Sequence, residues 1–129
     1  MLSKILIIDD SELSLSVMKA LIQESYLSER VSLTLCKNTV DAKEFIEKQD
    51  FDLIITDIVM PEISGYELIS HIKEHYQTPV LAISSGYGKD DPALVLETAK
   101  ELGADKVLFK FHLQQELVNT VSLYVQQAA

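Results

Sequence analysis

Two hydrophobicity patterns alternate along the chain. Five short runs are rich in apolar residues, and most of them are almost continuously apolar, which is typical of strands buried on both faces of a parallel sheet. These runs cover residues 4–9, 31–36, 52–57, 79–84 and 106–110. The stretches between and after them carry apolar residues at the three- and four-residue spacing of amphipathic helices. The pattern therefore predicts five strands, each followed by a helix.

The predicted helices span about residues 12–26, 40–48, 65–76, 91–103 and 113–126. Ser11 is the expected N-cap of the first helix, because a serine hydroxyl accepts a hydrogen bond from an amide in the first turn. Asp91 and Pro92 form a start signal for the fourth helix, and Gly103 is its expected stop. The residues expected to face the core are Leu13, Val17, Leu21 and Ile22, then Ala42, Phe45 and Ile46, then Leu68, Ile69 and Ile72, then Val95, Ala99 and Leu102, and finally Leu117, Val121 and Tyr124.

Length and composition fit one α/β domain that covers residues 1–129. Hydrophobic residues make up 47% of the chain, which is enough for a sizeable core. Crossovers between parallel strands are right-handed, so the expected architecture is a doubly wound sheet. No apolar stretch approaches the ~20 residues of a membrane span. The N-terminal residues lead directly into a strand, so we expect neither a membrane segment nor a signal peptide.

Charge and cysteine content narrow the function further. The formal net charge is −9 and the basic residues are scattered. This argues against nucleic-acid binding, which needs a basic surface. The single cysteine, Cys36, cannot form an internal disulfide. We expect it to pack at a strand end in a cytoplasmic protein.

Polar residues close four of the five apolar runs. Asp9 and Asp10 close the first, Asp57 the third, Ser84 the fourth and Lys110 the fifth. Open parallel α/β sheets bind ligands beyond the carboxyl ends of their strands, so these side chains should converge at one edge of the sheet.

The three aspartates suggest a metal and a nucleophile. Asp57 precedes a loop that contains Pro61 and Gly65, so we expect an exposed and rigidly held carboxylate, as a nucleophile requires. It could equally be a solvated aspartate at a strand end. Asp9 and Asp10 repel each other unless a cation such as Mg²⁺ binds them. The alternative is that one of this pair caps the following helix.

Lys110 and Ser84 suit the same site. Among three carboxylates, Lys110 would neutralise charge and hold a phosphoryl oxygen, although a lysine at a strand end can also extend into solvent. The hydroxyl of Ser84 could donate to the same phosphoryl group, although serine before glycine is also common in turns.

Taken together, these motifs resemble the receiver domain of two-component response regulators, of the single-domain chemotaxis type. The residues that carry the resemblance are Asp9-Asp10, the segment Asp57-Ile58-Val59-Met60-Pro61-Glu62-Ile63-Ser64-Gly65, Ser84 and Lys110. The resemblance extends from Lys4 to about Gln126. It implies a flavodoxin-like five-stranded parallel sheet with strand order 2-1-3-4-5 and five helices.

The resemblance also implies a function. Asp57 would accept a phosphoryl group from the phosphohistidine of a histidine kinase or a histidine phosphotransfer protein. Mg²⁺ would bind Asp10, Asp57 and the backbone carbonyl of Val59, with Asp9 acting mostly through water. Apart from Mg²⁺-dependent self-phosphorylation and autodephosphorylation, such a protein is a timed switch in a phosphorelay rather than an enzyme.

Signal output follows from the same resemblance. Lys110 would pair with the phosphoryl group and Ser84 would close on it. The usual output surface, which often dimerises, would include Lys100, Val107 and parts of residues 113–126. The sequence does not identify the output partner.

The chain departs from the family pattern at two positions. Phe111 follows Lys110 where the family usually has proline, often after a cis peptide bond. Val107 replaces the usual tyrosine or phenylalanine, and valine is too short and stiff to swing as a ring does. We therefore expect the signal to leave through Ser84 and the loop that begins at Ser85.

Three other functions can be compared with the sequence. An aspartyl phosphatase resembling the haloacid dehalogenase family needs a second acid two residues after the nucleophile, where this chain has Val59. A flavodoxin-like cofactor binder needs a phosphate-cradling loop, but the first loop is Asp9-Asp10-Ser11-Glu12. A degenerate receiver that only binds proteins is the alternative that the two departures leave open.

Overall fold

The computed structural model describes residues 2–58, 60, 65–84 and 92–125 of the chain. The strands are β1 (Ser3–Ile8), β2 (Val31–Cys36), β3 (Leu53–Asp57), β4 (Val80–Ser84) and β5 (Lys106–Phe109). The helices are α1 (Glu12–Gln23), α2 (Thr39–Lys48), α3 (Gly65–His75), α4 (Pro92–Glu101), the short 3₁₀ helix η1 (Lys110–His112) and α5 (Leu113–Ser122). Each predicted strand and α-helix is present, and the ends differ by a few residues.

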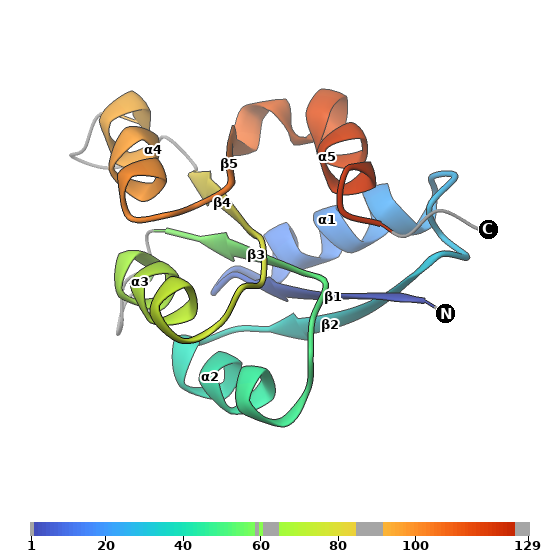
Figure 1. Ribbon diagram of the computed structural model, residues 1–129. Helices are drawn as coiled ribbons and strands as arrows, with labels where there is room; N and C mark the ends of the chain where they lie inside the picture. The colour runs from blue at the N-terminus through green and yellow to red at the C-terminus, as the bar shows by residue number, and fades with distance from the viewer. Residues whose placement is uncertain (1, 59, 61–64, 85–91, 126–129) are drawn as a thin grey trace.

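The strands form one parallel sheet in the order β2-β1-β3-β4-β5 (Figure 1). The predicted doubly wound fold and its strand order are therefore confirmed. Helices α1 and α5 cover one face of the sheet, and α2, α3 and α4 cover the other. Because β1 and β3 are interior strands with helices on both faces, nearly all of their side chains are buried.

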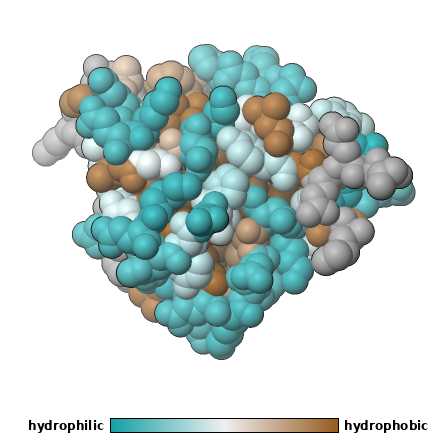
Figure 2. All heavy atoms as spheres, in the orientation of Figure 1, coloured by the Kyte–Doolittle hydropathy of each residue, from teal (hydrophilic) through white to brown (hydrophobic). Residues whose placement is uncertain are grey.

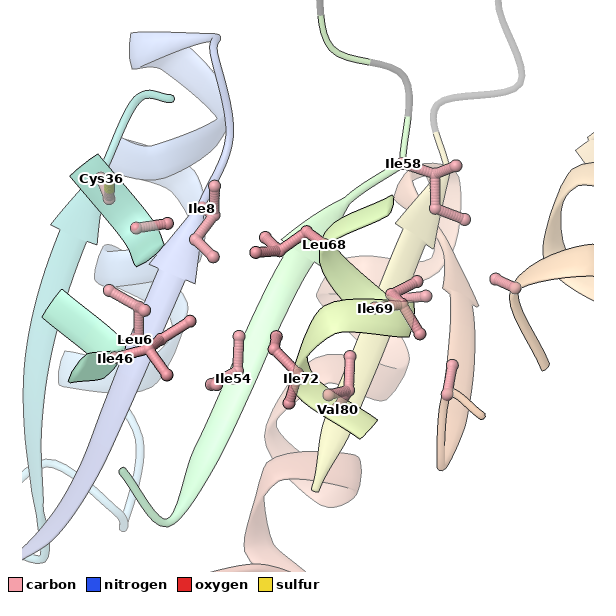
Figure 3. Packing of buried hydrophobic residues seen from close by; sticks show 14 of the residues in the cluster. Leu6, Ile8, Cys36, Ile46, Ile54, Ile58, Leu68, Ile69, Ile72 and Val80 are labelled. Atoms are coloured by element: carbon pink, nitrogen blue, oxygen red, sulfur yellow. The ribbon is translucent and has the colours of Figure 1, made fainter. Parts of the chain in front are cut away.

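Alternate residues of the strands pack into two separate hydrophobic cores, one on each face of the sheet. On β1, Leu6 and Ile8 point to the α2–α3–α4 side, whereas Ile5 and Ile7 point to the α1–α5 side. Figure 3 shows the first of these cores, where Leu68 and Ile72 of α3 pack over the strands. The continuous apolar runs of the sequence arise because each strand must satisfy both cores.

Local signals at the helix ends behave largely as expected. Ser11 caps α1, with its hydroxyl accepting from Ser14 N at 3.2 Å. Asn38 caps α2 in the same way, accepting from Asp41 N at 2.8 Å. Gly103 follows α4 with a φ of 116°, a left-handed conformation that favours glycine. The predicted cap Asp91 lies outside the described residues.

The prediction of which α1 residues face the core is wrong in part. Leu13 is 75% exposed and Val17 is 42% exposed. The buried residues of α1 are Leu15, Met18 and Ile22. Both sets have helical spacing, because α1 carries apolar residues on two faces, and periodicity alone does not choose between them. Leu102, predicted for the core, follows α4 and is also exposed.

Two further features concern the surface and the single thiol. The face shown in Figure 2 is covered largely by hydrophilic residues with separate hydrophobic areas among them. Within the part of the chain that the structure describes, no helix is long and apolar enough to cross a membrane. Cys36 ends β2 and is buried, as predicted, and burial raises the pKa of its thiol.

Gly65, the first residue of α3, allows the helix to begin against the end of β3. Its amide donates to Ile58 O at 2.8 Å. A Cβ atom built there would lie 2.4 Å from Asp57 O and 2.6 Å from Ile58 Cα. Any side chain would therefore push the helix away from the strand that carries Asp57.

Candidate functional site

The ends of four elements bring the predicted residues to one edge of the sheet. Asp9 follows β1, Asp57 ends β3, Ser84 ends β4 and Lys110 follows β5. The register aligns these ends, because Asp57 is opposite Ile83 and Ser84 is opposite Phe109. The convergence expected from the sequence is therefore present for these side chains.

Lys110 is the centre of the contacts. Its Nζ lies 2.7 Å from Asp9 Oδ2 and 3.4 Å from Asp57 Oδ2. It also donates to Ser14 Oγ at 3.1 Å. The lysine side chain is only 17% exposed, so these contacts lie mostly away from bulk water. The lysine thus binds the cluster rather than extending into solvent.

The three carboxylates form one cluster. Asp9, Asp10 and Asp57 each offer an oxygen within 4.8 Å of the others. Asp9 is fully buried, and its Oδ1 accepts from Ser11 N at 2.9 Å. Asp9 is therefore the member of the acid pair that satisfies the start of α1, while Asp10 is exposed.

Asp57 is buried rather than exposed, which corrects the prediction from its loop. Only 4% of the residue is accessible, because the strand end is enclosed by neighbouring side chains. Its Oδ2 contacts Lys110, whereas its Oδ1 is buried and has no hydrogen-bond partner among the described residues. A buried carboxylate oxygen without a partner is costly, so this atom is suited to a ligand.

Burial and charge make the Asp57 carboxylate unusually basic. Burial is the largest effect, and the negative charges of Asp9 and Asp10 add to it. The Lys110 ammonium opposes them but does not cancel them, and the pKa of Asp57 is raised to about 6. Burial alone would lower the pKa of Lys110, but the contacts with Asp9 and Asp57 outweigh it and the pKa is raised. The lysine is therefore a permanent cation, and one cation faces three acids.

These residues fit a hard divalent cation. Carboxylate oxygens are the ligands that Mg²⁺ prefers, and the cluster has more negative charge than Lys110 neutralises. The unpartnered Oδ1 of Asp57 supplies a free ligand atom at the same place.

The remaining predicted residues are less closely connected. Ser84 is buried, but within the described part of the chain its hydroxyl makes no hydrogen bond to Asp57 or Lys110. Val107 lies on β5 and packs at the edge of the α2–α3–α4 core. The described peptide bonds include no cis bond, so Phe111 follows Lys110 through a trans peptide. The predicted roles of Val59 and Ser85 concern residues outside the described part of the structure.

Sequence reasoning missed Ser14. Its signal was its place in the first turn of α1, five residues after Asp9, where a helix side chain can point back toward the sheet edge. That position alone predicts no contact, because it depends on how α1 and the end of β5 pack. The structure adds Ser14 to the site through its hydrogen bond with Lys110.

The fold and the site together define the class of protein. A five-stranded parallel sheet in the order 2-1-3-4-5 carries carboxylates and a lysine at its carboxyl edge, as in flavodoxin-like α/β proteins with an acidic ligand site. The family model for the response regulator receiver domain matches residues 5–122. The chain belongs to this family, and the resemblance noted in the sequence is confirmed.

Relatives in several organisms agree with this assignment. The chain is 35% identical over 108 residues to the "Regulator of RpoS" of Escherichia coli, a match that covers 83% of this chain and 30% of that protein. It is 30% identical to the "Transcriptional regulatory protein YdfI" of Bacillus subtilis, covering 97% of this chain and 56% of that protein. The chain therefore spans about a third to a half of these two relatives. It is 26% identical to the "Chemotaxis protein CheY" of Halobacterium salinarum, covering 95% and 96% of the two chains.

Solved structures show the same fold. The signal receiver domain of an HD domain-containing protein from Pseudomonas fluorescens superposes with a TM-score of 0.80 at 21% identity, covering 96% of this chain and 94% of the other. A CheY-like receiver domain from Methanospirillum hungatei gives a TM-score of 0.79 at 22% identity, covering 95% and 93%.

Proposed function

We propose that this protein is a phosphoacceptor switch in a two-component phosphorelay, in which Asp57 receives a phosphoryl group. The donor is the phosphohistidine of a histidine kinase or a histidine phosphotransfer protein. The observation that carries the proposal is the environment of the Asp57 carboxylate. One of its oxygens contacts Lys110, the other is buried without a hydrogen-bond partner in the described part of the chain, and two more acids lie beside it.

The chemistry is a nucleophilic displacement at phosphorus. A carboxylate oxygen of Asp57 attacks the phosphorus, and the phosphorus–nitrogen bond of the donor breaks with its electron pair leaving on the imidazole. An acyl phosphate on Asp57 results. Burial makes the carboxylate more basic, which favours attack at pH values above its pKa of about 6. Lys110, held 3.4 Å from Asp57, offsets charge on the transferring oxygens, and the rest is positioning.

The residues that would hold Mg²⁺ are Asp10 and Asp57, with Asp9 acting through water. Asp9 is the poorest direct ligand because its Oδ1 accepts from Ser11 N and its Oδ2 forms an ion pair with Lys110. When bound, Mg²⁺ supplies positive charge that stabilises the transferring phosphoryl oxygens. The proposed backbone contribution of Val59 completes this set.

The donor protein has to reach Asp57 from the carboxyl edge of the sheet. Two exposed apolar side chains of α1, Leu13 and Val17, lie on the helix whose Ser14 contacts Lys110. Phe111 follows Lys110 directly and is 58% exposed. This apolar surface beside an acidic site is suited to a protein that delivers a phosphohistidine. A Leu13→Asp variant should therefore lose transfer from a protein donor while retaining phosphorylation by acetyl phosphate.

The signal would leave the site through Ser84. Ser84 ends β4, which pairs with the strand that ends at Asp57, and α4 follows β4 in the chain. Val107 on β5 is too short to exchange positions as an aromatic ring would. A phosphoryl group that binds Ser84 better in one arrangement of this region shifts the population toward that arrangement. The output surface formed by α4, β5 and α5 then contacts a partner or a second copy of the chain.

Phosphorylation with a small donor tests the proposal. Wild type treated with acetyl phosphate and Mg²⁺ should show a species heavier by one phosphoryl group in mass spectrometry, and chelation of the metal should suppress it. Asp57→Asn should abolish the species, whereas Asp50→Asn, at an exposed position, should leave it unchanged. A species that persists in Asp57→Asn would show that another residue is the nucleophile. Absence of modification with every donor would identify a degenerate receiver that acts only by protein binding.

A further inference from the structure

The ammonium group of Lys110 lies among three oxygen atoms. It donates hydrogen bonds to Ser14 Oγ at 3.1 Å and to Asp57 Oδ2 at 3.4 Å. Asp9 Oδ2 lies 2.7 Å away as an ion-pair partner and has no hydrogen-bond partner among the described residues. A lysine ammonium donates at most three hydrogen bonds. Two of them are assigned in the described part of the chain, and the shorter of the two goes to a neutral hydroxyl rather than to an acid.

The backbone carbonyl of Lys110 accepts from Leu113 N, and the elements that position the lysine are short. Lys110 is the first residue of η1, and that turn has no side-chain cap hydrogen bond. β5, which delivers the lysine, has four residues and pairs with β4 alone in the described sheet. The residue after the lysine is Phe111 in a trans peptide, not a proline that would fix the chain. The position of the ammonium group is thus determined mainly by its acceptors.

Ser14 differs from the two acids in what it contributes. It lies on α1, 96 residues from Lys110 in sequence, so its contact joins the start of α1 to the end of β5. Ser11 Oγ accepts from Ser14 N, which fixes the backbone of Ser14 in the first turn. A hydroxyl accepts a hydrogen bond from the lysine without adding a fourth negative charge to the cluster.

We propose that Ser14 is a positioning residue for phosphoryl transfer, holding the Lys110 ammonium beside Asp57. This inference rests on the proposed function. During transfer, Ser14 keeps its hydrogen bond from the ammonium group and Asp9 keeps its ion pair with it. The hydrogen bond to Asp57 Oδ2, the longest of the three contacts, passes to an oxygen of the incoming phosphoryl group. No proton is transferred, and with acetyl phosphate the phosphorus–oxygen bond of the donor breaks and acetate leaves.

The test compares three serine variants in the full chain. With acetyl phosphate and saturating Mg²⁺, Ser14→Ala should lower the rate constant for Asp57 phosphorylation about tenfold, equivalent to ~1.4 kcal/mol. The Mg²⁺ concentration for half-maximal rate should not change, because Ser14 touches none of the ligand oxygens assigned to the metal. Ser14→Thr keeps a hydroxyl and should restore most of the rate. Ser16→Ala, at an exposed position of the same helix, is the matched control and should behave as wild type.

A measurement without any donor separates this inference from the proposed function. The ¹⁵Nζ and ¹³Cε resonances of Lys110, assigned with Lys110→Arg, should shift in Ser14→Ala and remain in place in Ser16→Ala. If wild type accepts no phosphoryl group, the proposed function fails and the positioning role in transfer fails with it, whatever the resonances show. If wild type is phosphorylated but Ser14→Ala reacts at the wild-type rate, or if the Lys110 resonances do not move, the inference alone is overturned.

Discussion

Two lysine–aspartate clusters lie at opposite edges of the same sheet, and they are built differently. At the amino edge, Lys73 Nζ lies 2.9 Å from Asp105 Oδ2 and donates to Thr78 O at 3.1 Å. The same Asp105 oxygen accepts from Val80 N at 2.8 Å. One cation meets one acid there, and the acid also satisfies the first amide of β4.

At the carboxyl edge, the negative charges outnumber the positive charges among the described residues. In the part of the chain that the structure describes, Lys110 is the one lysine in contact with Asp9 and Asp57, and Asp10 lies within the same cluster. Asp57 keeps a buried oxygen without a partner among the described residues. Over the described ranges, the charges at the amino edge are paired, whereas those at the carboxyl edge leave an excess of negative charge. Uncompensated charge, rather than charge itself, therefore distinguishes the candidate functional site.

The largest expected effect is on the free energy of unfolding. Removal of an acid should raise it at the carboxyl edge and lower it at the amino edge. Asp57 has a pKa of about 6 in the folded protein, against an ordinary value of 3.8. The native state therefore binds this proton more tightly than the unfolded state does, and stability falls as the pH rises through this range. At about 1.4 kcal/mol per pKa unit, the ionised carboxylate costs up to about 3 kcal/mol above pH 6. Asp57→Asn should raise the free energy of unfolding by up to that amount at pH 7.5 without metal.

The pH dependence identifies the cause. In denaturant titrations, the stabilisation by Asp57→Asn should shrink as the pH falls from 6 toward 4, because the wild-type carboxyl is then neutral. Asp50→Asn removes the same charge from an exposed position and should show neither the gain nor its pH dependence. A gain that is constant from pH 4 to 8 would mean that the charge of Asp57 is not its source.

Two glycine substitutions compare the effect of an added side chain at the carboxyl edge with its effect at the amino edge. Gly65→Ala should destabilise the protein by roughly 1–3 kcal/mol, because the new Cβ meets the rigid backbone of Asp57 and Ile58. It should also slow phosphorylation of Asp57. Gly103→Ala places its Cβ against the flexible Lys73 side chain and costs stability through its positive φ instead. Equal phosphorylation rates in the two variants, measured with acetyl phosphate, would show that the α3 start does not position Asp57.

At the amino edge, loss of the acid should cost stability. Asp105→Ala removes an acceptor from Lys73 Nζ and from Val80 N, so we expect a loss of about 1–2 kcal/mol, reduced by water because the side chain is 38% exposed. Phosphorylation should remain at the wild-type level. An increase in stability in thermal melts would contradict the view that this cluster is a structural joint.

The smallest effect concerns Mg²⁺. A metal that binds only the folded form raises stability by about 1.4 kcal/mol at ten times its Kd. Asp10→Ala should remove this response and also raise stability in the absence of metal, since one repelling charge is gone. Asp105→Ala should keep the full response. Thermal scans in which wild type and Asp10→Ala respond equally to Mg²⁺ would show that Asp10 is not a ligand.

The sequence was sufficient for the fold because the interior strands β1, β3 and β4 are largely apolar on both faces, and the edge strands still carry enough apolar residues to be recognised. These runs also placed Asp9, Asp57, Ser84 and Lys110 at strand ends. It was insufficient for α1, where two apolar faces fit a helical period equally well. Only the packing of α1 beside α5 selects Leu15, Met18 and Ile22 as the inner face.

The site was predicted in its composition but not in its environment. The sequence shows that Asp57 meets a loop, which suggested exposure, but the burial of its carboxylate depends on how the neighbouring elements close around it. Ser14 was missed for the same reason, because its contact with Lys110 spans 96 positions of the chain. Local patterns indicate which residues reach an edge, while tertiary packing decides which of them touch.

Lys110 lies far along the chain from the acids that it contacts, and this order affects how the site forms during synthesis. The acids come from the ends of β1 and β3, whereas the cation that touches them among the described residues follows β5. A chain still emerging from the ribosome can hold the acids before it holds Lys110, and in that interval their repulsion opposes closure of the site. Under the proposed function, competence to accept a phosphoryl group therefore arrives with the last strand, and an unfinished or C-terminally truncated copy carries Asp57 without Lys110.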